Sequence, residues 1–147
     1  MIQHYWTVLI KKSYTDELSK ALVLGEVLEN VRLNIPLNMK ENFEQELISK
    51  KFVTLPFDFE ILTFLGSDEP DQNAKLILEL ELPNGEINQL MTVDVATGAT
   101  GKCRNCFRSN GLFVGGSGVN KFRVYDVTDG KRKKLAEIPL GIDVQFV

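Results

Sequence analysis

The strongest constraint on the fold is an alternation of leucine with other residues in the segment Leu76–Leu82. Every even position of this segment is leucine, and the leucines share one face because successive side chains of a β-strand point to opposite faces. The segments Phe57–Ile61 and Ile142–Phe146 repeat the pattern, and Leu135–Leu140 is a weaker example. The sequence therefore predicts several strands that each bury one face.

Glycine-containing turns separate these strands. Asn84-Gly85 and Asp129-Gly130 each stand between two predicted strands, and Asn110-Gly111 is a third, smaller candidate turn. Asparagine, aspartate and glycine tolerate the positive φ angles that tight hairpins require. Short strands joined in this way predict a mostly β fold, an antiparallel two-layer β-sandwich.

Two segments before residue 52 are less regular. Ala21–Ile35 is interpreted as one bent strand or as two strands that meet near Gly25 or Asn30, with a helix as the competing interpretation. Residues 38–51 are predicted to form a short helix across one end or edge of the sandwich. Phe43, Leu47 and Ile48 lie there at helical spacing and are expected to face the core.

Length and composition indicate one globular domain spanning residues 1–147. The net charge of -3 and the pI of about 5.2 make nucleic acid an unexpected partner. No apolar run approaches the roughly 20 residues of a membrane span, and no secretory leader is recognisable. Two cysteines are too few for a secreted disulfide scaffold, so the expected location is the cytoplasm.

The segment Ala96–Gly118 contains six glycines and is predicted to be a long loop. Loops of this length are often functional, so the part from Thr97 to Gly118 is the expected recognition surface. Phe107, Arg108 and Phe113 are the candidate partner contacts, with burial of the two aromatic rings in the core as the alternative.

The same segment holds Cys103 and Cys106, whose spacing suits half of a tetrahedral zinc site. A second copy of the chain would have to supply the other two thiolates. The alternative is a pair of reduced thiols without a metal. No cofactor is predicted.

Charged residues gather near predicted turns. Acidic side chains that could bind calcium fall in two connections, Asp68, Glu69 and Asp71 in one and Asp126 and Asp129 in the other. The alternative for these residues is an ordinary role in turns. The one basic run could contact an anion or could protect an edge strand from pairing; it consists of Lys131, Arg132, Lys133 and Lys134.

No catalytic residues are predicted. A nucleophile needs a nearby base, and the single histidine, His4, lies in the expected first strand, far along the sequence from Cys103 and Cys106. Most aromatic residues, including Tyr5 and Trp6, lie in strand patterns and are expected in the core.

The arrangement resembles short uncharacterised bacterial proteins with an immunoglobulin-like sandwich. The residues that carry the resemblance are Leu22-x-x-Gly25, Leu55-Pro56-Phe57-x-Phe59, Leu82-Pro83-Asn84-Gly85 and Gly118-Val119-Asn120-x-Phe122-x-Val124. The resemblance implies a fold and brings no activity with it.

The leading hypothesis is a non-catalytic binding or scaffolding module that recognises a protein partner or itself. One alternative is a structural subunit of a phage or another multi-copy assembly. Another is a metal-binding protein or an enzyme that uses Cys103 and Cys106 or the acidic loops.

Overall fold

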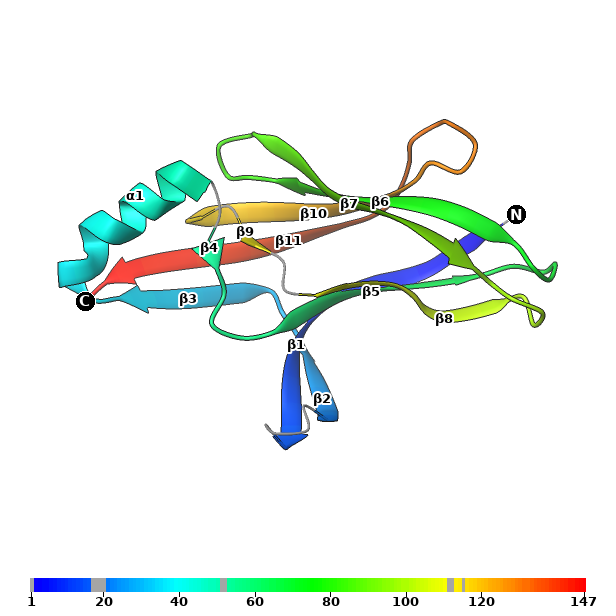
Figure 1. Cartoon of the computed structure of the whole chain (residues 1–147), viewed down its shortest axis with the longest axis horizontal. Helices are drawn as coiled ribbons and strands as arrows, with labels where there is room; N and C mark the ends of the chain where they lie inside the picture. Colours follow the sequence, from blue (N-terminus) through cyan, green and yellow to red (C-terminus); the bar gives the residue numbers. More distant parts are fainter. Residues whose placement is uncertain (1, 17–20, 51–52, 111–112, 115) are drawn as a thin grey trace.

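The strands form two main sheets that face each other across a shared core (Figure 1). The computed structural model describes residues 2–16, 21–50, 53–110, 113–114 and 116–147. Its strands are β1 (Gln3–Asp16), β2 (Ala21–Val27), β3 (Asn30–Ile35), β4 (Val53–Thr54), β5 (Phe59–Gly66), β6 (Asn73–Glu81), β7 (Ile87–Ala96), β8 (Lys102–Asn110), β9 (Phe113–Val114), β10 (Gly118–Asp126) and β11 (Lys133–Phe146).

Sheet A has the strand order β2-β1-β5-β8, and sheet B has the order β3-β11-β10-β6-β7. Neighbouring strands run antiparallel except β3 and β11, which are parallel. The short strands β4 and β9 pair with each other apart from both sheets. The protein is therefore mostly β, with two main sheets and one short helix, as the sequence predicts.

The core lies between the two sheets and is built by the alternating segments. Leu76, Leu78 and Leu80 of β6 are almost completely buried, which confirms that the leucines share the inner face. Across the core, the ring centroids of Phe59 in β5 and Phe122 in β10 lie 6.4 Å apart. Contacts of this kind hold sheet A against sheet B.

The predicted hairpins are present. Gly85 in the β6–β7 turn has a φ of 90°, and Gly130 in the β10–β11 turn has a φ of 82°. The third candidate turn includes Gly111, which lies outside the described residues. The segments Leu135–Leu140 and Ile142–Phe146 belong to the single long strand β11.

The segment Ala21–Ile35 forms two strands that end and begin near Asn30, one of the predicted break points. β2 belongs to sheet A and β3 to sheet B, so the chain passes from one sheet to the other between them. The Leu28 amide donates a hydrogen bond to the Leu9 carbonyl at 2.9 Å, and the Gly141 amide donates to the Glu29 carbonyl at 2.9 Å. These bonds fix the crossing to a strand of each sheet.

The predicted helix is present as α1 (Lys40–Lys50), preceded by the single 3-10 turn η1 (Leu37–Met39). Phe43 packs edge-on against Phe146, with 6.0 Å between ring centroids, and Leu47 also contacts the core. The prediction for Ile48 is wrong, because its side chain is 78% exposed. Only the narrow stripe defined by the i,i+4 pair Phe43 and Leu47 faces the sheets.

The prediction of a long loop over Ala96–Gly118 is wrong. Residues Lys102–Asn110 form strand β8, which pairs with β5 at the edge of sheet A. The true connection is a short turn in which Gly101 has a φ of 70° and the Ser67 amide donates to the Gly101 carbonyl at 2.7 Å. A β-carbon at Gly101 would lie 2.5 Å from the Ser67 carbonyl oxygen, so glycine is required by close backbone approach.

The helices among the described residues are too short or too polar to cross a membrane.

Candidate functional site

The outer face of sheet A carries an exposed pair of stacked aromatic rings. Trp6 of β1 and Phe64 of β5 face each other with 3.9 Å between ring centroids and 26° between ring planes. Trp6 is nevertheless 48% exposed. A large aromatic side chain held in one orientation at the surface has little conformational entropy left to lose when a partner binds.

The register of β1 and β5 shows why this face is apolar. Leu9 pairs with Ile61, and both point into the core with at most 1% exposure. The pairs on either side of it alternate with it and point outward: Trp6 with Phe64, Val8 with Leu62, and Ile10 with Glu60. Apolar side chains thus occupy both faces of the central strands of sheet A.

Tyr5 extends this surface. A register shift between His4 and Trp6 leaves Tyr5 without a direct partner in β5, and its side chain is 59% exposed. Its ring lies over Gly66, where an added β-carbon would approach Tyr5 Cε2 to 2.7 Å. We refer to Tyr5, Trp6, Val8, Leu62 and Phe64 together as the aromatic patch.

The expectation that Tyr5 and Trp6 belong to the core is wrong. The segment from Tyr5 to Ile10 is apolar at almost every position, so its alternation does not reveal which side chains face inward. The inner face is decided by pairing with β5, whose inward residues are fixed by the opposite sheet. Sequence analysis therefore missed that Trp6 lies exposed on the outer face of sheet A.

His4 lies at the start of the same strand in a chain of hydrogen-bonding side chains. Its Nε2 is 2.8 Å from Thr7 Oγ1, which is 3.0 Å from Thr63 Oγ1. Partial burial lowers the pKa of His4 below its ordinary value of 6.5, and the nearby charge of Lys133 acts in the same direction. The folded protein therefore disfavours a proton on this imidazole.

We expect the stability of the protein to fall in mild acid, and His4 to account for part of the loss. Because the pKa of His4 is lower in the folded than in the unfolded state, its contribution is present above about pH 6.5 and is lost as the pH falls through the lowered pKa. Urea unfolding at about pH 7.5 and about pH 5 should show a smaller loss for His4→Gln than for the wild type. Equal losses for the two proteins would contradict this prediction.

Farther along β1 and β5, past the apolar pairs, lies a buried ion pair between Lys12 and Glu60. Glu60 of β5 is 1% exposed, and its Oε2 lies 3.6 Å from Lys12 Nζ in β1. A buried carboxylate with an ammonium neighbour is expected to act structurally, holding β1 against β5.

The outer face of sheet B is polar and carries a network of charged groups centred on Arg123. This guanidinium donates to Glu137 Oε1 at 2.7 Å, to Glu81 Oε1 at 3.1 Å and to Glu79 Oε2 at 3.4 Å. Glu79 also accepts hydrogen bonds from Tyr125 and Arg132. The network therefore links β6, β10, β11 and the β10–β11 turn.

These contacts shift the titration of the network. The hydrogen bonds that Arg123 donates to the carboxylates, Glu137 first, raise the pKa of Arg123, and the same pairing lowers the pKa of Glu137. Burial raises the pKa of Tyr125 above 10.0, and the carboxylate of Glu79 adds to this effect. All three shifts favour the charge states present near neutral pH, in which Tyr125 is a neutral donor, so the network stabilises the fold.

The basic run lies in the β10–β11 turn and the start of β11. Arg132 is engaged internally, because it stacks on the Tyr125 ring at 4.3 Å and donates to Glu79 at 3.2 Å. Lys134 lies 4.0 Å from Glu137. Two of the four basic side chains, Arg132 and Lys134, therefore pair with carboxylates of the network.

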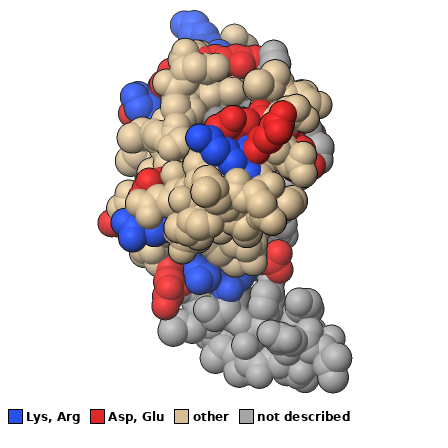
Figure 2. All heavy atoms as spheres, turned by 90° about the vertical axis from the view of Figure 1, so that its left-hand side faces the viewer, with Lys and Arg blue, Asp and Glu red and all other residues tan. Residues whose placement is uncertain are grey.

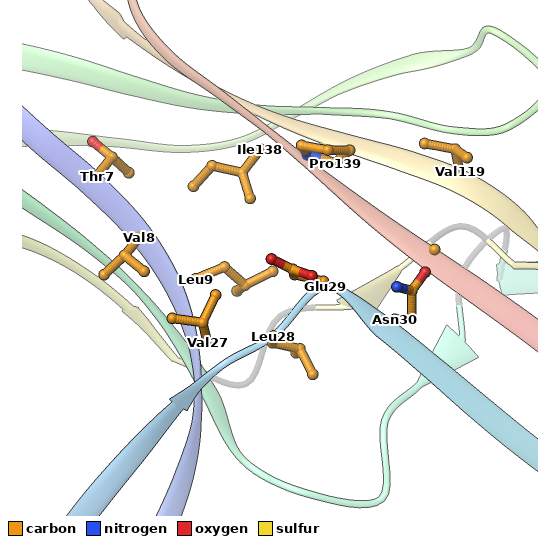
Figure 3. A pocket seen from close by; sticks show the side chains of 11 residues that line it. Thr7, Val8, Leu9, Val27, Leu28, Glu29, Asn30, Val119, Ile138 and Pro139 are labelled. Carbon is orange, nitrogen blue, oxygen red and sulfur yellow. The ribbon is translucent and has the colours of Figure 1, made fainter.

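A cleft of about 450 Å³ opens where the chain passes from β2 to β3 (Figure 3). Val27 and Leu28 lie on one side of it, and Ile138 and Pro139 of β11 lie on the other. Glu29 and Asn30 supply polar groups at the β3 side. Most of the side chains that line it are apolar, so the cleft suits an apolar group.

The candidate partner contacts of the 97–118 segment are placed differently from the expectation. Phe107 is 1% exposed and belongs to the core, in keeping with the alternative interpretation, so it offers no surface contact. Arg108 lies in β8 and Phe113 in β9, and their side chains lie outside the described part of the structure. The same holds for the side chains of Cys103 and Cys106, both in β8.

Three of the acidic residues in the two loops, Asp71, Asp126 and Asp129, make hydrogen bonds within the turns. Asp126 Oδ1 accepts a hydrogen bond from the Thr128 amide at 2.9 Å, and Asp129 Oδ1 accepts one from the Lys131 amide at 3.2 Å. Asp71 has a φ of 54° and donates its amide to the Gly98 carbonyl at 2.7 Å. Within the described ranges, no three side chains of His, Cys, Asp or Glu are grouped so that they could hold a metal ion.

Acidic and basic side chains are intermixed on the face of the molecule that carries α1 (Figure 2). This face shows no field of a single sign that would attract a polyanion. No protein-family model matches the chain, and no curated protein matches its sequence.

Proposed function

We propose that this protein is a non-catalytic binding module that recognises a protein partner through the aromatic patch. The observation that carries the proposal is the exposed Trp6 ring, held by its stack on Phe64. Tryptophan and tyrosine dominate the binding energy of protein interfaces, where they act as anchors surrounded by less important contacts. Trp6 and Tyr5 are adjacent candidates for such anchors.

The surroundings of Trp6 fit a protein interface better than a nucleic-acid interface. The neighbouring outward side chains, Val8 and Leu62, are uncharged and partly buried. Single-stranded nucleic acids also stack on aromatic rings, but such sites combine the rings with a basic groove. The net charge of -3 and the apolar character of the patch support a protein partner.

The finer description of the fold and the location belong to the same proposal. We take the arrangement to be immunoglobulin-like, as in short bacterial proteins of this kind, because consecutive strands β5 and β6 lie in different sheets and β6 pairs with the distant β10. The cytoplasm is the proposed location, and the presence of only two cysteines supports it.

Replacing Trp6 by alanine is expected to weaken partner binding by about 30-fold or more, because truncation of an interface anchor costs about 2 kcal/mol. The full-length protein, immobilised, would capture its partner from a lysate of the source cell. The partner would then be identified and titrated. Trp6 is the only tryptophan, so its fluorescence reports directly on contact with the patch.

Two further variants make the experiment specific. Trp6→Phe keeps an aromatic ring and should retain most of the affinity, whereas Ile48→Ser removes another exposed apolar side chain, on α1, and should change nothing. If Trp6→Ala, correctly folded by circular dichroism, binds the partner as tightly as the wild type, the proposed surface is wrong.

A metal-dependent role through Cys103 and Cys106 remains a separate alternative. Elemental analysis of the purified protein decides it, because two copies sharing one tetrathiolate zinc site would contain one zinc ion per two chains.

A further inference from the structure

Strand β7 forms an open edge of sheet B. Its hydrogen-bonded neighbour in the described structure is β6, on one side only. With 10 residues it is the longest of the four strands that border the two main sheets, since β8 has 9, β2 has 7 and β3 has 6. An open edge presents a row of backbone donors and acceptors to any extended chain.

The composition of β7 does not discourage such pairing. Proteins commonly protect an edge with lysine or proline, and β7 contains neither. Its one charged residue is Asp94. The neighbouring edge strand β8, by contrast, contains Lys102, Arg104 and Arg108.

The two faces of β7 are clearly different over Met91–Val95. Val93 pairs with Leu76 and Met91 with Leu78, so these side chains and Val95 face the core. Thr92 and Asp94 therefore point outward, and both are exposed. A chain that pairs with this edge must present apolar side chains on the inner face and polar ones on the outer face.

We infer that the partner of this edge is a second copy of β7, paired antiparallel about a two-fold axis at Val93. In this register Val93 faces its own copy and Met91 faces Val95, so the inner face of the joined sheet is continuous and apolar. On the outer face Thr92 lies opposite Asp94 of the other copy. The Thr92 oxygen already accepts from Gln89 Nε2 at 3.2 Å, so its hydroxyl is able to donate to that carboxylate.

Neighbouring registers are less favourable. A shift of the axis by half a residue would place core-facing side chains opposite outward-facing ones. An axis at Asp94 would place two carboxylates directly opposite each other. An axis at Thr92 would bring Leu90 into the pairing, and Leu90 is the extra residue of the bulge that follows the pair of Leu78 with Met91.

The inference is tested on the full chain by sedimentation velocity at low ionic strength, from about 1 μM to about 1 mM. The wild type should pass reversibly from the 16.6 kDa monomer to twice that mass. Thr92→Asp places like charges opposite each other at two symmetric positions and should weaken the dimer by about tenfold. Thr92→Lys places opposite charges there and should strengthen it severalfold.

Asn84→Asp is the matched control. It adds the same charge in the β6–β7 turn and keeps a side-chain oxygen that accepts the hydrogen bond from the Glu86 amide. It should leave the dimer unchanged. A wild-type protein that stays monomeric at about 1 mM overturns the inference, as does a dimer that Thr92→Asp and Thr92→Lys do not shift in opposite directions. Neither result bears on the aromatic patch, which lies on the outer face of the other sheet.

Discussion

Replacing Phe122 by alanine is expected to destabilise the protein by about 4 kcal/mol. Phe122 is 1% exposed at the centre of the core, where its ring lies 6.4 Å from the ring of Phe59 in the opposite sheet. The substitution removes apolar contacts and leaves a cavity between two sheets that cannot close without moving against each other. Equilibrium unfolding in urea measures the loss as a lower midpoint with an unchanged slope.

Val119→Ala, in the same strand, is the control, because Val119 is exposed and its truncation should change the free energy of unfolding by less than about 0.5 kcal/mol. A loss below about 1 kcal/mol for Phe122→Ala would mean that the two sheets are not packed through this ring.

Replacing Arg123 by alanine is expected to cost about 3 kcal/mol, although Arg123 lies on the outer face of the sheet. Its side chain is 13% exposed and contacts three carboxylates. Removing it leaves the almost fully buried Glu79 with hydrogen bonds from Arg132 and Tyr125 only partly replacing the lost ion pair. The loss of stability therefore comes mainly from leaving the buried carboxylate of Glu79 with too little positive charge beside it.

The matched control is Arg32→Ala. Arg32 pairs with Asp143 at 3.3 Å, but both side chains are more than half exposed, and such pairs contribute at most about 1 kcal/mol. The double variant Arg123→Leu with Glu79→Leu should recover much of the stability, because no buried charge then lacks a partner. If Arg123→Ala and Arg32→Ala cost the same, the network contributes no more than a surface ion pair.

Local patterns were sufficient to predict most strands. The leucines of β6 alternate strictly, and a strand with that pattern can bury its apolar side chains on one face only. Asn84-Gly85 and Asp129-Gly130 predicted the hairpins because the backbone at these glycines needs a positive φ. The helix was predicted from the spacing of Phe43 and Leu47.

The misassigned segments lack such a pattern. β8 contains polar and basic residues and is bordered by glycines, so only its pairing with β5 makes it a strand. Ile48 has helical spacing, but its side chain is exposed, whereas Phe43 and Leu47 pack against the core. In both cases the outcome depends on what is adjacent in space, and a local pattern carries no such information.

The alternation of side chains and the turn residues determined from the sequence alone that this chain forms hairpins with buried inner faces. The tertiary structure decided which residues form the candidate sites. Trp6 is exposed and Phe107 is buried because the partner strands and the opposing sheet fix the inward face of each strand. β7 is an open edge because the chain turns away to the other sheet after it, and the order of strands follows from long-range pairing rather than from any local pattern.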